Sequence, residues 1–181
     1  MRVPAIALFL LSFQLLFGQS QYPKEVFRPP LDIPIILAGT FGELRSNHFH
    51  SGIDIKTQQR QGLPVYAIAD GTITRIKISH WGYGKALYIA HPNGYTSVYA
   101  HPQKFSPEIE QYVKNIQYQK QSYEIEVFPD FGEIKVSKDS VVAYTGNTGG
   151  SSGPHLHFEI RNSINEKPTN PLMYGLEVRD A

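Results

Sequence analysis

The sequence predicts a mainly β protein, an antiparallel β-sandwich or open barrel in one domain. Short strand-like runs follow one another, at residues 65–69, 72–78, 85–91, 95–101, 141–145 and 155–161. Turn signals recur between these runs at short spacing, and strands do not alternate with long helices, which is typical of antiparallel sheets. The length of 181 residues and the 41% hydrophobic content suit a single globular domain with a sizeable core.

The turns between these runs are well marked in the sequence. Asp70-Gly71 separates the first two runs. Pro92-Asn93-Gly94 joins the runs 85–91 and 95–101 as a hairpin, because Asn-Gly accepts the positive φ of a tight turn. The run 155–161 follows a glycine-rich loop and is the last strand predicted.

One stretch departs from the β pattern. Apolar residues recur at helical spacing and predict an amphipathic helix over residues 107–121. After it, residues 123–128 alternate as a strand, and the turn signal at 130–132 sends the chain back. A helix and a hairpin are therefore predicted as an insertion over 106–138, which we expect to form one wall of the functional cleft.

The first twenty residues, 1–20, are typical of a secretory signal. Arg2 supplies a small positive charge, residues 6–17 are nearly all apolar, and small residues precede the polar segment that follows. The apolar run is shorter than the ~20 residues of a membrane-spanning helix; a buried N-terminal helix is the alternative. We expect an exported protein, in the periplasm, the cell envelope or outside the cell, without a transmembrane segment after cleavage. Residues 21–35 are Pro-rich and predicted as an extended N-terminal segment.

Charge and cysteine content exclude several functional classes. The formal net charge is +1 and no stripe of Lys and Arg is present, so we expect no nucleic-acid binding. Cysteine is absent, which excludes disulfides, a thiol nucleophile and thiolate metal ligands. The seven histidines remain as candidate metal ligands, together with Asp and Glu. We expect the protein to be a monomer.

The hexapeptide from His155 to Ile160, His-Leu-His-Phe-Glu-Ile, is the most informative segment. Strand side chains alternate between faces, so His155, His157 and Glu159 share one face, with the apolar residues on the core side. The spacing leaves open whether one or both histidines bind a metal ion, or whether they form a surface pair. Glu159 either orients an imidazole or forms a salt bridge at the rim.

A second cluster, His50-Ser-Gly-Ile-Asp54, is predicted as a loop that runs into a strand. Asp54 then points away from the core and can approach an ion together with His50. His101 ends the hairpin strand after Tyr-Ala. The glycine-rich loop 146–154 lacks the Lys-Ser/Thr ending of a phosphate-binding loop, so we interpret it as the rim of a cleft.

Five ordered motifs resemble those of the M23 peptidases, the lysostaphin/LytM-type family. They are the segments 50–54, 62–71, 82–84, 99–101 and 153–159, and the similarity extends over about 36–172. The resemblance implies a lysostaphin-type peptidase fold over residues 36–175, with a β-sheet cleft. It also implies a secreted zinc metalloendopeptidase that hydrolyses the peptide cross-links of peptidoglycan.

The resemblance further implies one Zn²⁺ on His50, Asp54 and His157, with His101 and His155 as catalytic groups. A catalytic zinc keeps three protein ligands and an exchangeable water, whose lowered pKa lets it attack the scissile amide. The two remaining imidazoles would carry the proton to the leaving amine. Among peptidoglycan stem peptides, a diaminopimelate-type D,D cross-link is expected rather than a polyglycine bridge.

Two other functions are compatible with parts of this pattern. A non-catalytic LytM-like protein would bind peptidoglycan or activate another hydrolase, and such relatives typically lack one or more ligands. A structural zinc module would need a fourth ligand. Outside the metal site, His91 is interpreted as structural and His48 as a surface residue, while His80 and Trp81 either line the substrate groove or are exposed loop residues.

Overall fold

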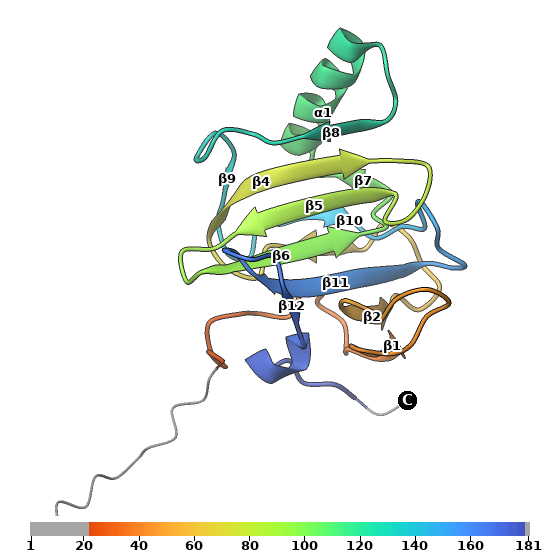
Figure 1. The fold of residues 1–181 in the computed structure, drawn as a ribbon, viewed down its shortest axis with the longest axis vertical. Coiled ribbons are helices and arrows are strands. Elements are labelled where there is room, and N and C mark those ends of the chain that lie inside the picture. The colour runs from red at the N-terminus through yellow and green to blue at the C-terminus, as the bar shows by residue number, and fades with distance from the viewer. Residues whose placement is uncertain (1–21, 180–181) are drawn as a thin grey trace, which may run out of the picture.

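The computed structural model describes residues 22–179, and the predicted signal 1–20 lies outside them. The larger of two sheets has the strand order β1-β2-β11-β6-β5-β4-β8, with β12 beside β11 and β9 beside β4. The smaller sheet has the order β3-β10-β7 and lies behind the larger one in the view of Figure 1. Every strand pairing within both sheets is antiparallel.

The elements have the following bounds: β1 Leu37–Gly39, β2 Ile53–Lys56, β3 Pro64–Tyr66, β4 Gly71–Ile78, β5 Lys85–Ala90, β6 Tyr95–Ala100, β7 Lys104–Phe105, α1 Pro107–Lys120, β8 Ile125–Val127, β9 Lys135–Val136, β10 Val141–Tyr144, β11 His155–Asn162, β12 Pro168–Thr169 and the 3-10 helix η1 Pro171–Tyr174. The predicted antiparallel, mainly β class is confirmed, as are the hairpin of β5 and β6 and the α-helix predicted over 107–121. The first predicted strand is shorter than expected, because its last residues form a bend before Gly71.

The hydrophobic core lies between the two sheets. Leu156, Phe158 and Ile160 on β11 are fully buried on one face, and Val65 and Val142 come from the smaller sheet. The N-terminal segment also contributes, since Phe27, Leu31 and Ile35 are buried in the same cluster. The packed face of β11 fixes the alternate residues of this strand on the opposite face, where the candidate site lies.

The insertion differs from its predicted form. The turn after β8 is present, with the Glu133 amide bonded to the Asp130 carbonyl at 2.9 Å. However, β8 and β9 both pair with β4 and do not pair with each other, so the predicted hairpin is wrong. The free edge of β4 would leave backbone groups unpaired, and the two short segments hydrogen-bond to it at different positions along the strand.

No helix within residues 22–179 is long and apolar enough to cross a membrane.

The helix α1 packs Ile109 and Val113 into the core and begins with Pro at its first turn, where the missing N–H costs nothing. Figure 1 shows α1 and β8 beyond β4, at the edge of the larger sheet opposite to β1 and β2.

Candidate metal centre

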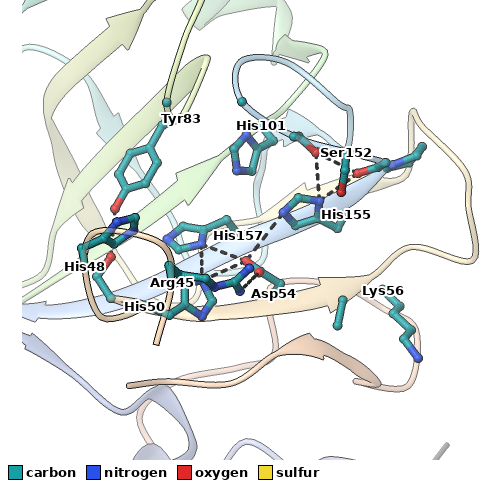
Figure 2. A pocket seen from close by; sticks show the side chains of 17 residues that line it. Arg45, His48, His50, Asp54, Lys56, Tyr83, His101, Ser152, His155 and His157 are labelled. Atoms are coloured by element: carbon teal, nitrogen blue, oxygen red, sulfur yellow. Dashed lines mark hydrogen bonds and ion pairs between the residues drawn. The ribbon is translucent and has the colours of Figure 1, made fainter. Parts of the chain in front are cut away.

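Three side chains from two adjacent strands and a preceding loop converge at one point. β2 and β11 pair antiparallel, and this register places Asp54 directly opposite His157. Ile53 and Ile55 are buried in the core, so alternation directs Asp54 to the other face, as predicted. His50 reaches the same point from the loop before β2 (Figure 2).

The ligand atoms of this group form a compact triangle. His50 Nε2 lies 2.9 Å from His157 Nδ1 and 3.1 Å from Asp54 Oδ1. The third side, between His157 Nδ1 and Asp54 Oδ1, is 2.9 Å. Ligand atoms on a tetrahedral zinc ion lie roughly 3.3 Å apart, given bonds of about 2.0–2.1 Å. The triangle therefore fits three of the four corners of such a coordination shell.

In each imidazole of the triangle, the ring nitrogen that faces away from the triangle donates a hydrogen bond. His50 Nδ1 lies 2.8 Å from the Thr40 carbonyl, which can only accept a hydrogen bond. His157 Nε2 donates to Glu159 Oε1 at 2.8 Å. With the ring proton held on the outer side, His50 Nε2 and His157 Nδ1 turn lone pairs toward Asp54. Three electron-rich atoms thus meet at about 3 Å, an arrangement that is stabilised by a proton shared between them in the metal-free protein or by a bound metal ion.

Glu159 is the buried acceptor that orients His157. Its side chain is fully buried and also accepts hydrogen bonds from Ser51 Oγ at 2.7 Å, from Arg161 Nε at 2.6 Å and from the Tyr83 hydroxyl. Burial raises the pKa of the Glu159 carboxyl, but the bonds from His157 and Arg161 outweigh burial and lower the pKa to about 2. Glu159 therefore stays ionised and combines both predicted alternatives, since it orients His157 and also forms a salt bridge with Arg161, in which its own carboxylate is buried and not at the rim.

The Asp54 carboxylate is held by an arginine as well. Arg45 Nη2 donates to Asp54 Oδ2 at 2.8 Å, leaving Oδ1 toward the histidines. Burial raises the pKa of Asp54, but in the metal-free protein hydrogen bonds that share a proton with His157 and His50 lower the pKa by more, so it lies well below its usual value. Gly39, opposite Asp54 in β1, leaves the space for this contact, because a Cβ there would lie 2.4 Å from Arg45 Nη2.

Two further imidazoles stand beside the triangle, with their rings 4.7 Å apart between centroids. His155 Nδ1 donates to the Gly153 carbonyl at 2.8 Å, and its Nε2 lies 3.6 Å from Asp54 Oδ1. His101 Nδ1 donates to the Thr148 carbonyl at 2.8 Å. In both rings, as in His50, the proton sits on Nδ1 and Nε2 is free to accept one.

His101 leaves its strand in an uncommon backbone conformation. Its φ is +66°, in the left-handed region that non-glycine residues rarely occupy. The conformation is held because its amide donates to the Tyr83 and Lys85 carbonyls at 3.1 Å each. Burial lowers the pKa of His101 to about 4, so this imidazole is neutral near pH 7. Strain of this kind is commonly retained where a side chain must be aimed.

The five histidine and aspartate residues border an open pocket of about 520 Å³. The glycine-rich loop forms one rim with residues 150–154, as predicted for it. This loop is held against the 82–84 loop, since the Gly150 amide donates to the Gly82 carbonyl at 2.8 Å. The volume lies within the range of small-ligand sites, and the open form suits a chain segment passing through.

The insertion does not contribute to this pocket. The lining residues include none from 106–138, so the expectation that the insertion forms one wall is wrong. The physical reason is its attachment to β4, which β5 and β6 separate from β11. His80 and Trp81 also lie outside the lining, whereas Gly82 and Tyr83 of the same loop belong to it.

Two histidines outside the site take different places. His91 is buried and hydrogen-bonded to the Asp70 carbonyl and to Ser97 Oγ, both at 2.8 Å, which fits the predicted structural role. His48 is exposed, as expected of a surface residue, but it also lines the pocket near His50.

Sequence reasoning gave no role to Tyr83, Arg45 and Arg161. Tyr83 lies between Gly82 and Gly84, both with positive φ, and this Gly-Tyr-Gly pattern is the one available signal for a fixed tyrosine. Arg45 carries no comparable signal, because its partner Asp54 is reached only through the folding of the intervening loop.

Comparison with known proteins places the chain in a family. The family model "Peptidase family M23" matches residues 48–118 and 132–171. The chain belongs to peptidase family M23. The break in the match, at 119–131, falls within the predicted insertion. The family assignment made from the five sequence motifs is thereby confirmed.

Two curated relatives and one solved structure illustrate the similarity. The chain is 37% identical over 133 residues, 74% of its length and 24% of the relative's, to the DD-carboxypeptidase/endopeptidase Mpg of Neisseria meningitidis serogroup B. It is 32% identical over 152 residues, 84% of its length and 32% of the relative's, to the murein hydrolase activator NlpD of Escherichia coli. It thus spans about a quarter to a third of these relatives.

The catalytic domain of lysostaphin from Staphylococcus simulans has a similar fold. The TM-score is 0.52 at 23% sequence identity, over 75% of this chain and 86% of that one. At this identity the likeness concerns the fold alone, and it agrees with the predicted lysostaphin-type architecture.

Proposed function

We propose that this member of the M23 family is an exported, zinc-dependent endopeptidase that hydrolyses peptide cross-links of peptidoglycan. The observation that carries the proposal is the convergence of three lone-pair atoms, from His50, Asp54 and His157, at the floor of an open pocket. Two histidines and one carboxylate are a donor set that zinc accepts readily. The family and the DD-carboxypeptidase/endopeptidase relative support peptide hydrolysis.

Each residue of the site has a separate task in this proposal. His50, Asp54 and His157 hold the ion, which supplies a Lewis acid that activates water and polarises the scissile carbonyl. His101 and His155 remain unligated, and their Nε2 atoms accept the proton released at the site. They then return it to the leaving amine, as a general acid. Glu159 and Arg45 keep the ligands oriented from outside.

An open coordination position distinguishes this proposal from a structural zinc site. The group of His50, Asp54 and His157 contains no fourth His, Asp or Glu at ligand distance within the described part of the chain. A closed structural site would use four protein ligands. The pocket above the triangle gives a peptide access to that position.

A non-catalytic activator of another hydrolase is the second candidate, because the chain is also similar to the murein hydrolase activator NlpD. Activators need a surface for their partner and do not need a ligated ion or free imidazoles. The retention of three ligand residues and two further histidines in one pocket favours the enzyme.

Alanine variants of the five residues test the proposal. We expect His50→Ala and Asp54→Ala to lose bound zinc and activity together. We expect His101→Ala and His155→Ala to keep stoichiometric zinc and lose most activity, because they serve the proton transfer alone. Metal content is measured by elemental analysis, and cleavage by mass spectrometry of fragments released from purified peptidoglycan. If purified zinc-loaded protein releases no fragment from any wall type, the enzymatic proposal fails and the activator takes its place.

A further inference from the structure

Positive charge along the pocket is only partly paired. Among the residues that line the pocket, Asp54 is the one acidic side chain, whereas Arg45 and Lys56 carry permanent positive charges. Arg45 donates to Asp54 at 2.8 Å and lies 3.5 Å from Glu43, so its charge is matched. Lys56 is exposed, and its ammonium has no ion pair within residues 22–179. Among the residues that line the pocket, the Lys56 ammonium is therefore the one permanent positive charge without an ion-pair partner.

The position of Lys56 relative to the reacting groups follows from the strand register. Lys56 lies two residues after Asp54 on β2, so both side chains leave the same face of the sheet. It is opposite His155 in the neighbouring strand β11. Figure 2 shows Lys56 at the His155 end of the group, away from His50, with its side chain directed away from the histidines. When this flexible side chain turns toward the pocket that it lines, its ammonium can contact a substrate group next to the scissile bond.

We propose that Lys56 binds a free carboxylate on the residue that supplies the amine of the scissile bond, and so selects carboxylate-bearing cross-links over neutral ones. The inference rests on the proposed function. His155 and His101 would protonate the leaving amine, so the amine half of the substrate lies at their end of the pocket, where Lys56 is. In a D,D cross-link the carbon that bears this amine also carries a carboxylate. In a polyglycine bridge the same position carries another amide and no charge.

The size of the effect follows from the exposure of the ion pair. Exposed pairs contribute little, and a pair at the edge of a half-open, positively charged pocket contributes somewhat more. We expect the carboxylate to raise kcat/KM by roughly three- to tenfold. The preference weakens as ionic strength rises, because salt screens a charge that is open to solvent.

The test uses two cross-linked peptides that differ in one group. Both carry the same D,D amide bond, and the carbon beside the amine bears a carboxylate in one and a carboxamide in the other. The zinc-loaded full chain, Lys56→Gln and the control Lys114→Gln are compared by the ratio of kcat/KM for the two peptides. Lys114 is an exposed lysine on α1, outside the pocket, so its substitution removes the same charge without touching the site. The Kd of the amine-side product, as acid and as amide, gives the same comparison without turnover.

The outcomes separate this inference from the proposal beneath it. We expect the wild type and Lys114→Gln to prefer the carboxylate peptide, in both kcat/KM and product Kd, and Lys56→Gln to bring both ratios close to one. Equal cleavage of the two peptides by the wild type overturns the inference and leaves the peptidase intact. An unchanged preference in Lys56→Gln does the same. Cleavage of neither peptide, together with equal product Kd values, overturns the assignment of Lys56 and counts against the proposed function.

Discussion

The role assigned to Glu159 predicts that Glu159→Gln weakens zinc binding and destabilises the protein by separate routes. Glutamine keeps the shape and one oxygen, so the bonds to Oε1 from His157, Ser51 and Tyr83 have an acceptor. The Oε2 side becomes an NH₂ group that faces Arg161 Nε, where a 2.6 Å charge-assisted bond is replaced by two opposed donors. A carboxylate no longer fixes the His157 ring, and an amide is a weaker acceptor.

The magnitudes follow from the burial of this network. Removing one partner of a buried ion pair costs about 3–5 kcal/mol. We expect about 3 kcal/mol in the free energy of unfolding, because Arg161 retains Glu166 at 3.5 Å as a weak partner. Loss of an orienting acceptor costs metal affinity roughly 10–100-fold. Chemical denaturation of the metal-free protein measures the first effect, and competition with a zinc chelator measures the second.

Glu166→Gln is the matched control for this experiment. It removes the same charge from the other partner of Arg161, but at a half-exposed carboxylate. Its expected cost is below about 1 kcal/mol, without a change in zinc affinity. If Glu159→Gln bound zinc as tightly as the wild type while losing stability, Glu159 would hold Arg161 alone and the account of His157 orientation would be wrong.

Two further predictions concern the supports of the site. Gly39→Ala places a Cβ 2.5 Å from Asp54 Oδ2, so we expect a loss of about 1–3 kcal/mol on chemical denaturation and weaker zinc binding, whereas Gly153→Ala, with open space around its Cβ, changes stability little. His101 has its pKa lowered by burial to about 4 from 6.5, so the unfolded chain binds more protons between these values. Its contribution to the free energy of unfolding, on the order of 3 kcal/mol, is complete above pH 6.5 and is lost as the pH falls through 4. We expect His101→Gln to make the free energy of unfolding of the metal-free protein less dependent on pH in this range, as measured by chemical denaturation. A pH dependence equal to that of the wild type would refute the assignment.

Features with a fixed local period could be predicted from the sequence. The shared face of His155, His157 and Glu159 follows from strand alternation, and the structure has it. The β5–β6 hairpin was likewise encoded by its Asn-Gly turn. The family motifs identified which five residues to examine, and the fold brings all five into one pocket.

Features that depend on partners distant in the chain could not be predicted in this way. The pairing of Asp54 with His157 joins strands about a hundred residues apart, and no local pattern specifies that register. The proton on His50 Nδ1 is held there by the Thr40 carbonyl, which lies near His50 only when the loop between them is folded. The path of β9 back to β4 depended on a free sheet edge that exists only in the assembled sheet.

The central claim is that the three inward-facing atoms of His50, Asp54 and His157 share one ion. Crystals of zinc-loaded protein, measured at the zinc absorption edge, locate the ion by its anomalous signal. We predict one strong peak at about 2.0–2.2 Å from His50 Nε2, His157 Nδ1 and an Asp54 oxygen, with no further protein ligand. A peak bonded instead through His155 or through His157 Nε2, or one outside this pocket, would contradict the account.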